Sequence, residues 1–98
     1  MKQPAVYIVT NRKNGVLYIG VTSDLVRRIY QHKSHAVEGF TEHYCLERLV
    51  WYELHGTMES AIRREHNLKH WRREWKTALI EENNPDWRDL WPDIVGWR

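Results

Sequence analysis

Two short apolar stretches near the start of the chain have the composition of β-strands. Residues 5–10 and 16–21 are rich in β-branched, aromatic and aliphatic side chains, as strands usually are. Between them lies Asn14-Gly15, a dipeptide that tight hairpin turns favour. The pattern therefore predicts an antiparallel hairpin that places two tyrosines, Tyr7 and Tyr18, on neighbouring strands.

The apolar residues after the hairpin recur at the spacing of an amphipathic helix over about residues 23–34. We expect Thr22 or Ser23 to cap this helix, with Asp24 in its first turn, where a carboxylate is favourable. The expected apolar stripe consists of two lines of side chains, Leu25 with Ile29 and Val26 with Tyr30.

Candidate chemistry is concentrated where the second strand turns into this helix. Gly20 frees the backbone just after Tyr18. On the helix, Arg28 and His32 are four residues apart, so they project together beside the apolar stripe. A tyrosine at a strand end can converge with these two side chains on one anionic group. This stretch therefore predicts a phosphate-binding site.

The rest of the chain predicts one more strand, two more helices and a tail. The expected elements are a polar segment with Gly39 over 35–43, a strand over 45–54, a helix over about 57–72 capped by Thr57, and a helix over about 73–83. The last of these has an expected apolar side of Trp75, Ala78, Leu79 and Ile80. We expect a single domain over residues 1–98, onto which the Trp-rich tail 84–98 docks through Trp87, Leu90, Trp91, Ile94 and Trp97.

Glu65 is the unusual residue of the 57–72 helix. Placed at about 100° per residue, three apolar side chains fall within about 60° of it: Ala61, Ile62 and Leu68. A carboxylate on an inward face needs a cation, a hydrogen-bond network or a metal. Glu65 is therefore either a metal ligand or one half of a structural salt bridge to an arginine or lysine.

Composition fits an ordinary globular chain, with 42% hydrophobic and 29% charged residues. No apolar run approaches the roughly 20 residues that span a bilayer. The start of the chain has no signal-peptide pattern, and a single cysteine, Cys45, fits a reducing compartment, so we expect a cytoplasmic protein. Residues 1–80 carry net positive charge and residues 81–98 net negative charge, which is compatible with a polyanionic partner.

In order and spacing, these residues resemble the GIY-YIG nuclease domain family. The first motif reads Ala-Val-Tyr at residues 5–7, with alanine in place of the family's glycine, and the second is intact as Tyr-Ile-Gly at residues 18–20. The match continues through Asp24, Arg28, His32 and Glu65. The tail, Asn-Pro-Asp-Trp-Arg-Asp-Leu, is similar to that of small bacterial stand-alone members, which are related to the N-terminal domain of an excision-repair endonuclease.

The resemblance implies an α+β fold, a small three-stranded antiparallel sheet flanked by helices. It also implies a metal-dependent endonuclease that hydrolyses phosphodiester bonds in DNA, with one Mg²⁺ or Mn²⁺ held by Glu65. Arg28 would then bind the phosphate, while Tyr18, Tyr7 and His32 handle the attacking water. By the same resemblance Asn84 is the asparagine of the site, with Asn83 and Asn67 as alternatives.

Other interpretations stay open at this point. The chain has room only for a nuclease core, which favours as runner-up a nucleic-acid-binding module with little or no catalysis. A third hypothesis is a protein-interaction domain that uses the Trp-rich tail, and a protein partner for targeting is compatible with each. The helical pair His66 and His70 has the spacing of a zinc site but lacks further ligands. A basic run interleaved with Trp71 and Trp75 is either a solvated helix face or a nucleic-acid surface: Arg63, Arg64, Lys69, Arg72, Arg73 and Lys76.

Overall fold

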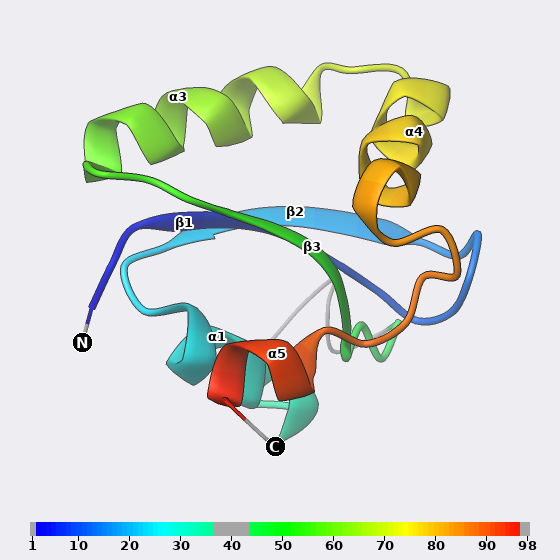
Figure 1. The fold of residues 1–98 in the computed structure, drawn as a ribbon, viewed down its shortest axis with the longest axis horizontal. Helices are drawn as coiled ribbons and strands as arrows, with labels where there is room; N and C mark the ends of the chain where they lie inside the picture. Colours follow the sequence, from blue (N-terminus) through cyan, green and yellow to red (C-terminus); the bar gives the residue numbers. More distant parts are fainter. Residues whose placement is uncertain (1, 37–43, 97–98) are drawn as a thin grey trace.

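The structure, a computed structural model, describes residues 2–36 and 44–96. Within these ranges its strands form one antiparallel sheet in the order β2-β1-β3. Helices α3 and α4 cover one face of the sheet, and α1 and α5 cover the other (Figure 1). The predicted α+β class with a three-stranded sheet is confirmed. The elements are β1 (Ala5–Thr10), β2 (Leu17–Thr22), α1 (Leu25–Lys33), β3 (Arg48–Leu54), α3 (Met58–Lys69), α4 (Arg73–Asn83) and α5 (Trp91–Val95).

The predicted hairpin is present and its turn uses the expected chemistry. Asn14 adopts a positive φ of 60°, a conformation that asparagine tolerates better than most residues. The Gly15 N–H donates to the Arg12 carbonyl at 2.9 Å, and the Asn11 side chain accepts from the Val16 N–H at 3.1 Å. The turn thereby fixes the register of β1 against β2, in which Tyr7 lies opposite Gly20.

The central strand β1 is completely buried, and its side chains alternate between two hydrophobic cores. The core against α3 and α4 contains Val6, Ile8, Ile19, Val50, Trp51, Ala61, Leu68, Ile80 and Trp87. The core on the α1 and α5 face contains Ala5, Tyr7, Val9, Leu25, Ile29, Leu46 and Leu49. Tyr7 therefore faces α1, the helix that carries Arg28 and His32.

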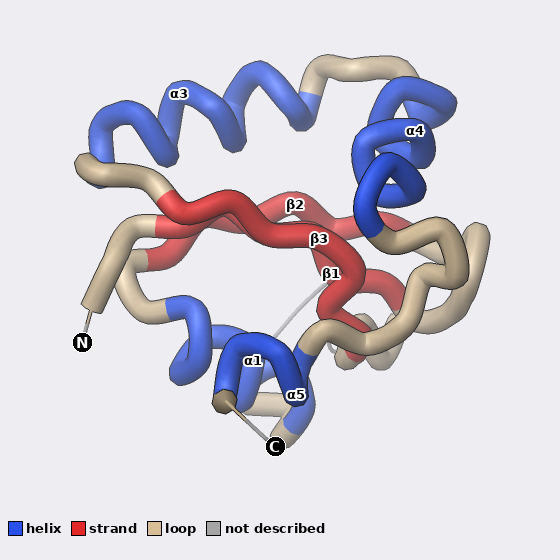
Figure 2. The backbone as a smooth tube through the Cα atoms, viewed as in Figure 1, coloured by secondary structure: helices blue, strands red, loops and turns tan. Residues whose placement is uncertain are grey.

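Strand β3 has a bulge that the tail covers. Val50 is the extra residue, because Ile8 pairs with Trp51 whereas its neighbour Val9 pairs with Leu49. At this point the Leu90 N–H of the tail donates to the Leu49 carbonyl at 2.8 Å. The backbone tube shows the loop after α4 running alongside β3 before it enters α5 (Figure 2). The tail thus occupies backbone groups that an edge strand would otherwise leave open.

The described part of the tail packs against the body through four of the five residues named from the sequence. Trp87 is completely buried, and three other residues pack partly buried against the α1-side core, namely Leu90, Trp91 and Ile94. Trp97 and residues 37–43, including Gly39, lie outside the described residues. The short helix α5 was not predicted from the sequence. Because its described tryptophans are packed against the body, the tail offers little apolar surface for the protein-interaction hypothesis.

Several predicted boundaries were wrong for local reasons. Asp24 is the N-cap of α1, accepting from the Arg27 N–H, because the Thr22 hydroxyl is occupied by the Asp24 N–H at 3.1 Å. Strand β3 begins at Arg48 rather than at Cys45, whose φ of 54° is incompatible with a strand. The predicted helix over 57–72 ends already at Lys69, although its cap, Thr57, is correct.

Some predicted apolar positions are exposed. In α1 the buried side is formed by Leu25, Ile29 and His32, whereas Val26 and Tyr30 point to solvent. Ile62 of α3 and Trp75 of α4 are each 51% exposed, and Ala78 is exposed as well. No helix in the described part of the chain is long and apolar enough to cross a membrane.

Candidate active site

Tyr7 and Gly20 are packed closely against each other at the site. The Tyr7 ring lies over Gly20, so that a Cβ built at Gly20 would be 2.4 Å from the Tyr7 hydroxyl oxygen. Any side chain at position 20 would displace this ring. Ala5, which stands where the family motif has glycine, lies in regular strand pairing and is not among the residues with positive φ. The alanine is therefore accommodated without backbone strain.

The Tyr7 hydroxyl lies at the centre of a buried polar cluster. It is hydrogen-bonded to His32 Nε2 at 3.0 Å and accepts from Arg28 Nε at 3.3 Å. A further hydrogen bond joins Arg28 to Tyr18, and the Tyr18 ring centroid is 5.9 Å from that of His32. The structure thus brings together four of the six predicted site residues, from β1, β2 and α1. We call Tyr7, Tyr18, Arg28 and His32 the tyrosine cluster.

The members of the cluster differ in what they can touch. Tyr7 is completely buried and His32 is 3% exposed, so neither contacts a ligand directly. Tyr18 and Arg28 are partly exposed. The Arg28 guanidinium has five N–H donors, and the bonds to Tyr7 and to Gln31 Oε1 at 3.2 Å leave some of them unused. Arg28 and Tyr18 therefore form the accessible surface of the cluster. Tyr7 and His32 lie beneath this surface, where the Tyr7 hydroxyl binds Arg28.

Burial sets the protonation states of the cluster. Desolvation raises the pKa of Tyr7 to about 12, with the nearby charges of Tyr18 and Glu65 adding to the rise and Arg28 opposing it. Burial, together with the charge of Arg28, lowers the pKa of His32 to about 4. The hydrogen bond to Tyr7 raises the pKa of Arg28. At neutral pH the cluster consequently holds one fixed positive charge, that of Arg28, beside a neutral tyrosine and a neutral histidine.

One atom of the cluster has no partner. His32 Nδ1 is buried and makes no hydrogen bond with any described residue. If Tyr7 donates to Nε2, the ring proton sits on this unpartnered Nδ1; if Nε2 carries the proton, Nδ1 presents only a lone pair. Both arrangements disfavour a second proton on the ring, in agreement with the lowered pKa.

Glu65 contributes a carboxylate from α3, on the other side of the sheet. Its side chain is 16% exposed and forms an ion pair with Lys69 Nζ at 2.9 Å, one turn further along the helix. Its charge acts on Tyr7, where it is a minor cause of the raised pKa. A half-buried carboxylate is a suitable hard ligand for Mg²⁺ or Mn²⁺. The residues present fit one such cation once the ion pair between Lys69 and Glu65 has opened.

Comparison with known proteins identifies the family of the chain. The family model of the GIY-YIG catalytic domain matches residues 3–78. The chain belongs to the GIY-YIG family. A UPF0213 protein of Staphylococcus saprophyticus is 33% identical over 84% of this chain and 99% of its own length. One from Aeromonas salmonicida is 30% identical over 95% of this chain and 69% of its own length. The solution structure of a UPF0213 protein from Bacillus halodurans superposes with a TM-score of 0.56 at 30% identity, covering 94% and 96% of the two chains.

Asn84, the predicted asparagine of this GIY-YIG domain, is held away from the tyrosine cluster at the β3 edge. It ends α4 and is 5% exposed. Its side-chain amide donates to the Val50 carbonyl at 3.1 Å and to the Arg88 carbonyl at 2.9 Å, and its oxygen accepts from the Arg88 N–H. These bonds tie the tail to the bulge of β3. The alternatives Asn83 and Asn67 are both exposed.

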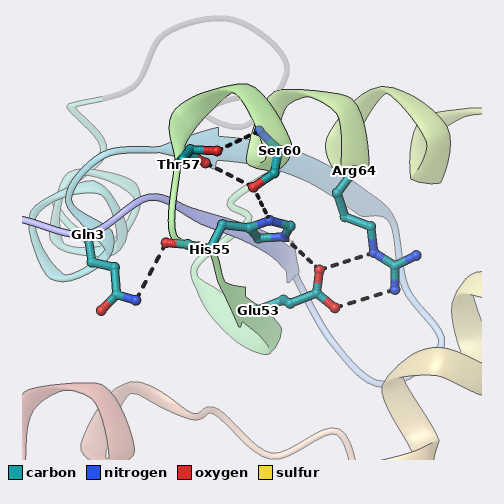
Figure 3. Close-up of polar contacts among 6 residues, drawn as sticks. All are labelled: Gln3, Glu53, His55, Thr57, Ser60 and Arg64. Carbon is teal, nitrogen blue, oxygen red and sulfur yellow. Dashed lines mark hydrogen bonds and ion pairs between the residues drawn. The ribbon is translucent and has the colours of Figure 1, made fainter.

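Helix α3 is held against β3 by a network of side-chain hydrogen bonds that was not predicted from the sequence. His55 bonds to Ser60 Oγ at 2.9 Å through Nδ1 and to Glu53 at 2.7 Å through Nε2 (Figure 3). Arg64 donates to the same carboxylate at 3.1 Å. Glu53 on β3 thereby fixes the rotation of α3, which carries Glu65 next to Arg64. The sequence feature that could have indicated this network is a glutamate and a histidine two residues apart at the end of β3, Glu53 and His55.

Among the described residues, the pair His66 and His70 lacks further ligands, as the sequence indicated, and another group of potential metal ligands lies elsewhere. The rings of His66 and His70 are 4.8 Å apart, but in the described ranges no third ligand groups with them. Three other residues beyond the end of α1 do come together, with ligand atoms within 4.8 Å of one another: His35, Cys45 and Glu47. His35 is already paired with Glu47 at 2.7 Å.

Proposed function

We propose that this GIY-YIG domain is a metal-dependent endonuclease that hydrolyses phosphodiester bonds in DNA. The observation that carries the proposal is the tyrosine cluster, in which a permanently charged arginine is held by a buried tyrosine beside a partly exposed one. A planar guanidinium with unused donors is well suited to bind a phosphate. A buried support fixes its position before the substrate arrives, which favours catalysis.

Each residue has a role in the proposal. Arg28 binds the non-bridging oxygens of the phosphate, and Tyr18 orients the attacking water from its partly exposed position. Tyr7 and His32 are positioning residues, because they are too buried to touch the substrate. His32 stays neutral and holds the Tyr7 hydroxyl in place through the hydrogen bond at its Nε2. Glu65 would hold one Mg²⁺ or Mn²⁺, which supplies positive charge for the phosphate and the leaving oxygen.

The test is nicking of supercoiled plasmid and cleavage of branched and damaged DNA with Mn²⁺ or Mg²⁺. We expect Glu65→Gln to lower the rate by at least about a hundredfold, because it keeps the shape of the side chain but removes the charge. Glu59→Gln is the matched control: Glu59 lies on the same helix and forms an exposed ion pair with Arg63. Equal rates for the two variants would contradict the proposal.

The second candidate is a nucleic-acid-binding module with the same fold and little catalysis. The observation that favours it is the Glu65–Lys69 ion pair, since a carboxylate already neutralised by a lysine binds a cation less readily. Salt-dependent binding of DNA without cleavage, in wild type and Glu65→Gln alike, would support this module and exclude the endonuclease.

A further inference from the structure

A basic and aromatic surface lies where α3 ends and α4 begins. The two helices meet at an angle over residues 70–72 (Figure 1). We define the junction surface as four residues around this corner: Lys69, Arg72, Trp75 and Lys76. Trp75 is the outstanding member, because 51% of a large apolar side chain is exposed. Its ring lies beside the Arg72 guanidinium, and this combination of an exposed aromatic ring with a cation suits the stacking of an unpaired base.

The indole of Trp75 is held in a defined position although it is exposed. The Arg72 guanidinium lies over its ring at 5.4 Å from the centroid. The Trp71 ring meets it edge-on, with centroids 6.3 Å apart and planes at 85°. Both contacts limit the movement of the ring. Stacking of a base on this ring therefore costs little free energy for ordering the Trp75 side chain.

Two of the three positive charges of the junction surface are free to bind an anion. In the described part of the chain neither Arg72 nor Lys76 forms an ion pair with a carboxylate, and Lys69 pairs only with Glu65. Neighbouring Arg73 is different, because its guanidinium is bound to the Gly15 carbonyl and serves the fold. Lys76 Nζ lies 3.4 Å from the Lys69 carbonyl, so the two ammonium-bearing side chains share one side of the corner.

The junction surface is continuous with the candidate active site. Lys69 and Lys76 line a shallow pocket of about 270 Å³ together with Leu17, Tyr18 and Ile19 of β2. Tyr18 belongs to the tyrosine cluster, and Lys69 also touches the carboxylate of Glu65. A polyanion bound along this surface would therefore reach both Tyr18 and Glu65.

From these contacts we propose that the junction surface binds an unpaired DNA strand and delivers it to Tyr18 and Arg28. Lys69, Arg72 and Lys76 contact successive phosphates, and one base stacks on Trp75. Double-stranded DNA does not satisfy this surface, because its bases are already stacked on one another and leave no ring face for the indole. The inference rests on the proposed function and makes it more specific: the substrate is single-stranded or carries an unpaired segment.

The experiment measures binding separately from cleavage. Wild type is titrated in EDTA with oligothymidine of about 12 nucleotides and with a blunt duplex of equal length, following tryptophan fluorescence and the anisotropy of labelled DNA. We expect the single strand to bind at least about tenfold more tightly than the duplex, and Trp75→Ala to remove about tenfold of that affinity. Lys76→Gln should reduce the slope of log K against log salt by about 0.7.

Tyr30→Ala is the matched control, because Tyr30 is 61% exposed on α1, outside the junction surface. Circular dichroism establishes that each variant is folded, as expected for exposed positions. Equal affinity of Trp75→Ala and Tyr30→Ala for the single strand, or a duplex that binds as tightly as the single strand, would overturn the inference and leave the proposed nuclease intact. Conversely, Trp75-dependent binding with no cleavage in Mn²⁺ would support this surface and contradict the nuclease.

Discussion

The tyrosine cluster and the Glu65–Lys69 pair belong to one candidate site but are built in opposite ways. Tyr7 and His32 are almost inaccessible, and the cluster is held together by residues of β1, β2 and α1. Glu65 is paired with a lysine of its own helix whose side chain is 48% exposed. The cluster cannot rearrange without disturbing the core, whereas Lys69 can leave Glu65 by rotating into solvent.

Because of this difference, we expect substitutions in the two regions to change different properties of the protein. Strain or a missing atom in the tyrosine cluster should affect stability and activity together, because the same contacts serve both. Changes at the Glu65–Lys69 pair should affect cation and DNA binding while leaving stability almost unchanged. Substitutions in the two regions can therefore be tested against each other.

Gly20→Ala should have the largest effect. The new Cβ would lie 2.4 Å from the Tyr7 hydroxyl, so we expect a loss of about 3 kcal/mol in the free energy of unfolding, together with loss of nicking. Gly56→Ala is the control, because no atom lies within 4 Å of a Cβ placed there and its effect should stay within about 1 kcal/mol. Urea denaturation measures both, and similar losses would show that the cluster is not tightly packed.

The pH dependence of stability should report on His32. Its pKa is lowered to about 4 in the folded protein from 6.5, so the unfolded chain binds the proton more readily. The free energy of unfolding is highest above pH 6.5 and decreases as the pH falls towards 4, with about 2 kcal/mol lost by about pH 5. His32→Gln should flatten this slope relative to wild type, whereas exposed His66→Gln should not. Parallel slopes for all three proteins would contradict the burial of a neutral histidine.

Tyr7→Phe removes one oxygen from the cluster and should cost about 1 to 2 kcal/mol of stability. The substitution leaves His32 Nε2 without a partner, in addition to Nδ1, and removes an acceptor from Arg28. Tyr30→Phe, at a 61% exposed position, should change stability by less than about 0.5 kcal/mol. Thermal unfolding of the two variants decides whether the Tyr7 hydroxyl is important for the fold.

Lys69→Gln should give the smallest change in stability, less than about 0.5 kcal/mol, because Lys69 is 48% exposed, its pair lies within one helix, and glutamine can still donate to Glu65. Without the competing lysine, Mn²⁺ should bind about two- to threefold more tightly. Arg63→Gln breaks the similar pair with Glu59 and should leave Mn²⁺ affinity unchanged. Titration by electron paramagnetic resonance in the absence of DNA compares the three proteins, and identical curves would mean that Lys69 does not compete for Glu65.

The sequence was sufficient for those features that depend on local pattern. Asn14-Gly15 predicted the hairpin because this dipeptide suits that turn. The pattern of the strand and the helix predicted that Tyr18, Arg28 and His32 converge, and the family resemblance added Tyr7. Glu65 was expected to be at least partly buried and is 16% exposed. In each case neighbours along a strand or helix determine the outcome.

Features that depend on distant contacts could not be predicted. The rotation of α3 exposes Ile62, and it is set by the bond of Arg64 to Glu53 on β3 rather than by the helix itself. Asn84 resembled a site residue in sequence, but its amide is used by the Val50 carbonyl at the bulge of β3. A bulge has no sequence signature strong enough to indicate which amide will bind it.

In the proposed function, Arg28 and Glu65 act on the same phosphodiester. The most direct measurement is single-turnover nicking by Arg28→Lys, Glu65→Asp and the double variant, which keep charge and hence measurable activity, with Arg27→Lys and Glu59→Asp as controls on the same helices. Because residues that act as a unit are non-additive, the double variant should be about as slow as the slower single one, and the controls should match wild type. Rate losses that multiply, or controls that are equally impaired, would contradict a single shared site.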